Sequence, residues 1–334
     1  MDPSVKRTLT KPTNWLTFSG GLLLIFLLLR QINGRDVLDM LLATDPGWFL
    51  LACGVYVLAN LLRAERFTVM LAMPGAWAPV TILPQMFALS LLNNVLPGRA
   101  GELSFPYYMY KRHGMSIGES GSALLTARIF DYVAIAVLYL FFTLRELDNL
   151  NPDAARIVTG VGVLLAISVL LLVSAPWLAD AAVIFTERLL RATKRHEASP
   201  ARSLIATGKQ AAIALRRMRN PRTYLLTFVW SLAVWLVTFA WFAALMQAIG
   251  LKQRYPLVVV GSTFASLAKA IPFVTIGGFG AHEAGWTIGF TLTGMARETA
   301  IASGFAVNIL TLLMSVIFGS AALIYLQRNG GEAE

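Results

Sequence analysis

Long apolar runs separated by short polar connections are the dominant pattern of this chain. A helix needs roughly 20 apolar residues to cross a hydrocarbon core about 30 Å thick. Six runs predict full crossings, at about residues 14–32, 47–71, 117–143, 157–176, 223–249 and 300–327. The first run follows basic residues like a signal peptide, but no small-residue cleavage site comes after it. We therefore expect it to remain as a helix.

Two further apolar segments, residues 80–112 and 257–294, are interrupted by proline and glycine. Freed backbone groups find no water in the bilayer core, so such breaks favour hairpins of short helices over straight spans. The order helix, helix, hairpin, helix then occurs twice. We predict an all-α polytopic membrane protein with six full spans and two re-entrant hairpins, or eight spans if each hairpin crosses.

The predicted repeats divide the chain near its middle, into residues 1–150 and residues 151–334. Each repeat has three full crossings, which is an odd number, so the second is expected to have inverted topology. Inverted repeats are common in secondary transporters, whose binding site lies between the repeats near the middle of the membrane.

The composition supports the membrane assignment and locates the basic residues. Only 14% of the residues are charged and 57% are hydrophobic, whereas about 25% are charged in soluble domains. The net charge is +10, and ten of the 28 Lys and Arg lie between Arg188 and Arg222, within a basic amphipathic segment at 177–222. This clustering indicates a cytoplasmic connection near anionic lipid headgroups, not a nucleic-acid partner. Basic and acidic connections alternate along the chain, which predicts cytoplasmic N- and C-termini.

Each hairpin contains a motif that runs from a proline through glycines to a glutamate. The turn residues are Pro97, Gly98 and Gly101 in the first motif and Pro272, Gly277, Gly278 and Gly280 in the second. Glu102 and Glu283 then lie at the mouths of half-helices, where helix N-termini favour anions. Each glutamate is a candidate for gating or proton coupling. The alternative is that it caps its own helix.

Two basic residues of the hairpins are candidate ligands for a lipid phosphate. Arg99 lies between Gly98 and Ala100, close to free backbone donors, and a guanidinium fits phosphate in a bidentate manner. Lys269 lies inside the second hairpin and is expected to face Glu283 or a lipid phosphate.

Charged residues also interrupt the long helices. Arg128 and Asp131 are three residues apart, so they share one face near the middle of the 117–143 helix. We expect them to pair with each other or with a hairpin residue, either as a static ion pair or as a moving gate. Arg63 and Arg66 lie in the last third of the 47–71 helix, where snorkelling to the interface is the expected behaviour.

No catalytic or metal-binding motif is complete. His282-Glu283 begins a His-Glu-x-x-His pattern, but position 286 is Trp, which excludes a zinc site of that type. His282 remains a candidate for proton coupling. We therefore expect no enzyme activity, no metal and no cofactor.

The two glycine motifs, together with Ala127-Arg128-Ile-Phe-Asp131, resemble the lysylphosphatidylglycerol synthase transmembrane region, also called the flippase-like domain family. The resemblance covers nearly the whole chain. It implies a role in moving aminoacylated phosphatidylglycerol across the bacterial inner membrane, and relatives accompany dolichol-phosphate sugar, hopanoid and other lipid pathways. The sequence holds no counterpart of the synthase's aminoacyl-transferase domain, so the resemblance implies no synthase activity here.

Together these observations predict a flippase-like translocase in the cell inner membrane, acting on a lipid with an anionic or phosphate-containing headgroup. ATP hydrolysis is not expected, because no Walker motif is present. The predicted phosphate ligands are Arg99, Arg128 and Lys269, and the predicted gating or proton-coupling residues are Glu102, Asp131, His282 and Glu283. The alternatives are a membrane enzyme, or a non-catalytic membrane subunit that assists a biosynthetic enzyme of a lipid, hopanoid-type or lipid-linked sugar pathway.

Overall fold

The computed structural model describes residues 34–73, 78–96, 101–146, 220–269 and 278–328, with Arg30, Gly75 and single positions between 156 and 174. Within these residues the chain forms helices and turns and no strand, which confirms the all-α prediction for this part. The predicted helix at 14–32 apart from Arg30, most of 157–176, and the basic segment 177–222 up to residue 219 lie outside the described residues.

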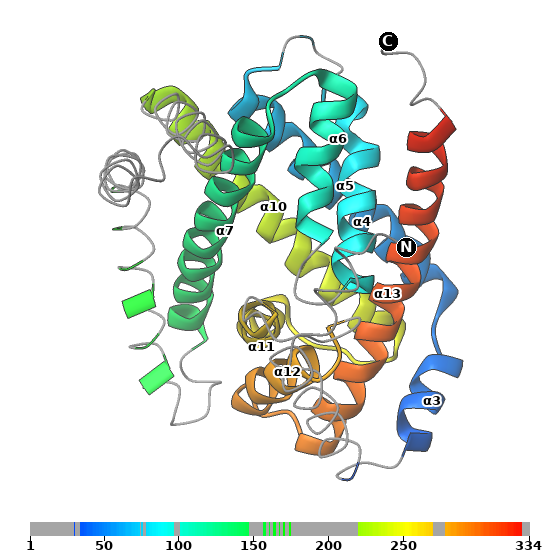
Figure 1. Cartoon of the computed structure of the whole chain (residues 1–334). Coiled ribbons are helices and arrows are strands. Elements are labelled where there is room, and N and C mark those ends of the chain that lie inside the picture. Colours follow the sequence, from blue (N-terminus) through cyan, green and yellow to red (C-terminus); the bar gives the residue numbers. More distant parts are fainter. Residues whose placement is uncertain are drawn as a thin grey trace, which may run out of the picture.

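Four helices of the described chain are long and apolar enough to cross a membrane. They are α4 (Pro46–Leu71), α7 (Ile117–Arg145), α10 (Pro221–Ala248) and α13 (Arg297–Arg328) (Figure 1). Their bounds lie within three residues of four of the predicted crossings, so the structure has a long apolar helix at each of these positions. The segment before α4, expected to be a connection, contains a nine-residue helix, α3 (Gly34–Leu42).

Local signals explain why the boundaries of these helices were predictable. The Asp45 carboxylate caps α4 by accepting the Trp48 backbone N–H at 2.8 Å, and Pro46 occupies the first turn. Asn220 and Pro221 play the same two roles at the start of α10. The length of the apolar run therefore predicts where α4 and α10 lie, and the capping residue determines where each helix begins.

The predicted hairpins are two pairs of short helices. The first pair is α5 (Ala78–Val95) and α6 (Ser104–His113), and the second is α11 (Tyr255–Ala268) and α12 (Ala281–Leu292). A Cβ on Gly101 would lie 2.3 Å from the Asn93 backbone nitrogen, so the turn can press against α5 only with glycine there. Likewise, a Cβ on Gly289 would lie 2.0 Å from the Gly261 carbonyl oxygen, which shows how closely α12 packs on α11.

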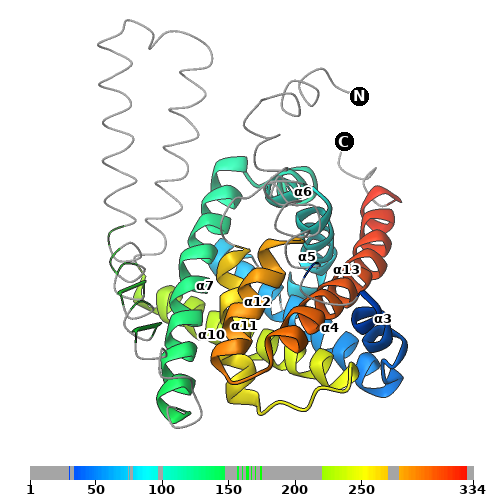
Figure 2. The same cartoon turned by 90° about the horizontal axis from the view of Figure 1, so that it is seen from below.

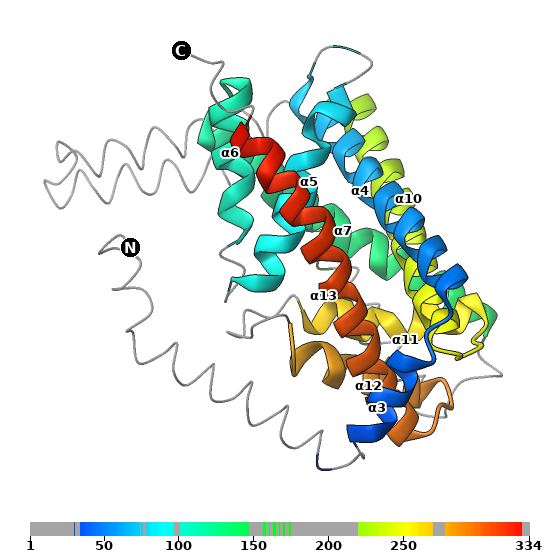
Figure 3. The ribbon, with the colours of Figure 1, turned by 90° about the vertical axis from the view of Figure 1, so that its right-hand side faces the viewer.

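The two short pairs lie at opposite ends of the molecule, with α5 and α6 above and α11 and α12 below in Figure 1. Each long helix that follows a short pair also packs on the other pair: α7 contacts α6 and α11, while α13 contacts α12 and α5 (Figure 2). The remaining long helices, α4 and α10, run side by side (Figure 3). The Asp45 backbone N–H at the start of α4 donates to the Ala248 carbonyl at the end of α10, so these two helices are antiparallel.

Candidate functional site

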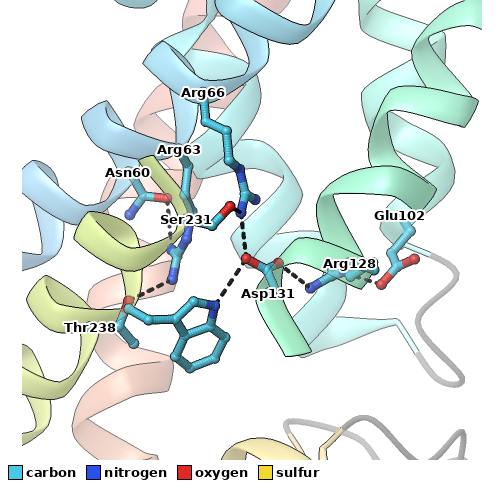
Figure 4. Close-up of polar contacts among 9 residues, drawn as sticks. Asn60, Arg63, Arg66, Glu102, Arg128, Asp131, Ser231 and Thr238 are labelled. Atoms are coloured by element: carbon cyan, nitrogen blue, oxygen red, sulfur yellow. Dashed lines mark hydrogen bonds and ion pairs between the residues drawn. The ribbon is translucent and has the colours of Figure 1, made fainter. Parts of the chain in front are cut away.

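Asp131 is the centre of an ion network that joins three long helices. It is the fifteenth of the 29 residues of α7. Its Oδ1 accepts hydrogen bonds from Arg66 Nη1 of α4 at 2.5 Å and from Trp235 Nε1 of α10 at 3.0 Å (Figure 4). Arg66 is only 3% exposed and also donates to Ser231 at 3.0 Å. A buried charge is tolerated when it is paired and hydrogen-bonded, and Asp131 meets both needs of Arg66.

The network continues toward the first hairpin through Arg128. Arg128 Nη1 lies 3.9 Å from Asp131 Oδ2, and Arg128 Nη2 donates to Glu102 Oε1 at 2.7 Å. The Arg128 and Glu102 side chains are 29% and 24% exposed, so this end of the network is less buried than the Arg66–Asp131 pair. The prediction that Arg128 pairs with Asp131 or with a hairpin residue is confirmed, because both contacts form.

Arg63 lies one helical turn before Arg66 but has different partners. Its Nη1 donates to Asn60 Oδ1 at 3.4 Å and its Nη2 to Thr238 Oγ1 at 3.2 Å, and both acceptors are neutral (Figure 4). The structure places no carboxylate of the described residues within ion-pair distance of Arg63. Snorkelling was the wrong expectation for Arg66, because α7 and α10 cover that face of α4 and supply its partners.

A second polar cluster joins the second hairpin to α13. Lys269 Nζ donates to Asn308 Oδ1 at 3.2 Å, and Asn308 Nδ2 donates to Glu283 Oε1 at 2.9 Å. The other Glu283 oxygen accepts the Gly280 backbone N–H at 2.6 Å and so caps α12. Gly280 has φ of 90°, a conformation that favours glycine. Lys269 and Glu283, expected to face each other, are thus connected through Asn308.

A cavity of about 270 Å³, lined by both apolar and charged side chains, lies between these two clusters. Its walls come from α4, α5, α7 and α10, with contributions from the second hairpin and α13. The charged residues that line it are Arg63, Arg66, Arg128, Asp131 and Lys269. Four cations and one carboxylate line the cavity, and this excess of positive charge suits an anionic ligand. Among the described residues no group of three His, Cys, Asp or Glu side chains could hold a metal ion.

Nearly the whole chain matches one known protein family. Residues 14–319 match the sequence model of the lysylphosphatidylglycerol synthase TM region. The chain belongs to this family. The resemblance expected from the glycine motifs is confirmed, and with the apolar helices it establishes a multi-pass membrane protein.

One curated relative of this chain is Glycosyltransferase AglD of Haloferax volcanii. The two sequences are 27% identical over 313 residues. The match covers 83% of this chain and 49% of the relative, so the chain spans about half the length of that protein. No solved structure matches the chain.

The structure brings most of the sequence-predicted residues of this family member to the cavity or to its two clusters. Arg128, Asp131 and Lys269 line the cavity, and Glu102 and Glu283 contact it through Arg128 and Asn308. The turn residues Gly101, Gly278 and Gly280 are described, whereas Pro97, Gly98, Arg99, Pro272 and Gly277 lie outside the described residues.

His282 does not line the cavity. It is fully buried against Trp286 and Phe242, with ring centroids 5.4 and 6.3 Å away. Neither of its ring nitrogens has a hydrogen-bond partner among the described residues.

Sequence reasoning missed a stripe of polar residues on α4. Tyr56, Asn60, Arg63 and Arg66 are spaced by three or four residues, so they share one helix face, and all four line the cavity. Polar groups at that spacing within an apolar helix were the available signal. Interpreting Arg63 and Arg66 as separate snorkelling residues does not consider the helix face that they share with the other two.

Proposed function

We propose that this protein translocates a lipid with an anionic, phosphate-containing headgroup across the cell inner membrane without ATP hydrolysis. The observation that carries the proposal is the cavity lined by four cations between helices long enough to cross a membrane. Ionisable side chains inside membrane spans are rare, face the bundle interior and mark substrate pathways. The headgroup enters the cavity while the acyl or prenyl chains stay in the bilayer, and both protein termini are cytoplasmic.

The proposed roles follow from how each charge is held. Arg128 and Lys269 bind the phosphate, and Arg99 in the turn of the first hairpin adds a third ligand. The Glu102–Arg128 pair is partly exposed and separates at a lower cost than a buried pair, so it is suited to gating. The buried Arg66–Asp131 pair resists separation and holds the helices together. His282 and Glu283 are proposed to take part in proton coupling from the second hairpin. The activity includes no chemical step and needs no cofactor.

The contacts between α4 and α10 support an inverted repeat. Asp45-Pro46 and Asn220-Pro221 begin the two helices in the same way. Arg63 and Thr238 are each the eighteenth residue of their helix, and they bond to each other at 3.2 Å. Equivalent residues that meet between antiparallel helices are expected when a two-fold axis lies in the membrane plane.

The two glutamates support the same arrangement. Glu102 pairs with Arg128, the twelfth residue of α7, and Glu283 bonds to Asn308, the twelfth residue of α13. Each half therefore attaches its hairpin glutamate to the same position of the following long helix. In this proposal the two attachments alternate as the repeats rock around the cavity.

Glu102→Gln tests the gate. We expect it to slow headgroup translocation at least about tenfold. A neutral amide no longer displaces the lipid phosphate from Arg128, so release of the headgroup becomes slow. The free energy of unfolding should change by less than about 1 kcal/mol, because the pair is partly exposed. The measurement is the rate at which fluorescent phosphatidylglycerol in proteoliposomes becomes accessible to an impermeant quencher.

Glu298→Gln is the matched control, since Glu298 is exposed in the first turn of α13. It removes the same charge and should translocate at the wild-type rate. Wild-type protein that moves the lipid no faster than protein-free vesicles would refute the translocase proposal.

The relative named as a glycosyltransferase favours one second candidate, a non-catalytic membrane subunit or region in a lipid-linked sugar pathway. That role requires a partner enzyme and no movement of lipid by the purified protein alone. Proteoliposomes that hold only this chain therefore distinguish the two functions: translocation favours the first, and its absence, together with co-purification of a biosynthetic enzyme, favours the second.

A further inference from the structure

A basic and aromatic surface forms where α6 meets the end of α13, and its residues do not line the cavity. Arg112, in the last turn of α6, has its Cζ 5.4 Å from the ring centroid of Tyr325 on α13. Figure 3 shows the two helix ends beside each other. A guanidinium over an aromatic ring makes a favourable cation–π contact. This contact connects the first hairpin to the last long helix and holds a cation at their junction.

Three basic residues at this junction have no acidic partner. Lys111 and Arg112 lie in the last turn of α6, and Arg328 ends α13 one helical turn beyond Tyr325, on the same face. Lys111 and Arg328 are exposed. The structure places no carboxylate of the described residues within ion-pair distance of any of the three. The junction is therefore suited to bind an anion.

Exposed aromatic and apolar side chains next to these charges indicate that the anion belongs to a lipid. Tyr107 and Tyr110 of α6 and Tyr325 of α13 are all exposed, and so are Leu103 before α6 and Ile324 on α13. Tyrosine is enriched at the level of the lipid headgroups, because its ring is apolar and its hydroxyl is polar. A phosphate ion in solution would use only the charges, whereas a phospholipid also covers the apolar side chains.

We propose that the junction of α6 and α13 binds the phosphate of an anionic phospholipid that stays outside the cavity, with Lys111, Arg112 and Arg328 as its ligands. The inference goes beyond the proposed function, because this lipid is not the one translocated. A helix C-terminus favours cations by itself, which accounts for basic residues at the end of α6. It does not account for the stacking of Arg112 on another helix. A lipid bound here would join the first hairpin to α13.

The test maps where anionic lipid contacts the purified full chain in nanodiscs of phosphatidylcholine. The probe is phosphatidylglycerol with a photoreactive diazirine in one acyl chain, close to the glycerol, at low mole fraction. Tandem mass spectrometry then measures the labelling of peptides from α6 and from the end of α13, normalised to total labelling. Phosphatidylcholine with the same diazirine is the zwitterionic comparison. We expect the phosphatidylglycerol probe to label these peptides at least about fivefold more strongly.

Arg112→Gln should lower this labelling by roughly five- to tenfold, because the phosphate loses a charge-assisted contact. Tyr325→Leu should lower it by roughly two- to fivefold, because the ring no longer holds the guanidinium in place. Arg222→Gln is the matched control, since Arg222 is exposed in the first turn of α10, and it should leave the labelling unchanged. A melting curve establishes that each variant is folded, and Arg112→Lys, which keeps the charge, should be labelled more strongly than Arg112→Gln.

The outcomes separate this inference from the proposed function. Equal labelling of the junction by the two probes would overturn the inference, and so would equal labelling of Arg112→Gln and wild type by phosphatidylglycerol. Loss of labelling on addition of inorganic phosphate at constant ionic strength would show that the junction takes phosphate from solution, which also overturns it. Selective labelling of a protein that does not translocate lipid would overturn the proposed function alone. Translocation with unselective labelling would overturn the inference alone.

Discussion

Asp131→Asn is expected to lower the free energy of unfolding by about 3–5 kcal/mol, the usual loss when one partner of a buried ion pair is removed. Asparagine has almost the same size, so the substitution leaves no cavity. It leaves Arg66, which is 3% exposed, as a buried cation without its carboxylate. It also weakens the bond from Trp235 of α10. Thermal unfolding of the purified protein in detergent measures the effect.

The control for this prediction is Asp39→Asn, which changes an exposed aspartate of α3 in the same way. The two variants should differ clearly in melting temperature, and similar values would show that the Arg66–Asp131 pair does not hold the helices together. Arg66→Met combined with Asp131→Leu should recover much of the lost stability, because apolar residues of similar volume can replace a buried pair. The recovered protein should still fail to translocate lipid, since Arg128 then lacks one of its carboxylates.

Gly289→Ala is expected to destabilise the protein by about 3 kcal/mol, the upper end of the usual range for overpacking. The added Cβ would lie 2.0 Å from the Gly261 carbonyl oxygen, and main-chain atoms cannot move aside as a side chain can. The short helices α11 and α12 must then separate. Lys269 directly follows α11 and Glu283 lies in the first turn of α12, so their connection through Asn308 should be disturbed. Melting temperature and the rate of translocation should therefore fall together.

Gly54→Ala is the matched control for Gly289→Ala. Gly54 lies inside α4, and a Cβ there would meet nothing within 4 Å. Alanine has the higher helix propensity, so this variant should be unchanged or more stable by up to about 1 kcal/mol. If both glycine variants melted at the same temperature, close packing of α11 on α12 would not be important for stability.

Much of the architecture could be predicted because it depends on local properties. The lengths of the apolar runs place the long helices, and the capping pairs Asp45-Pro46 and Asn220-Pro221 mark where α4 and α10 begin. The prolines and glycines of the two motifs indicated the hairpins. The spacing of Arg128 and Asp131 placed both on one face of their helix, and pairing with a hairpin residue was expected; in the structure that residue is Glu102.

The sequence by itself therefore determined the class of protein, the approximate positions of its described helices other than α3, and several of the residues around the cavity. Only the tertiary structure decided which charges neutralise one another. Arg66 and Asp131 are 65 positions apart, and no local spacing connects them. Their pairing depends on how α7 and α10 pack against α4, because the interaction of two charges falls steeply with distance and with exposure to water. The same packing leaves Arg63, one turn away on the same helix, with neutral partners and a cavity in front of it.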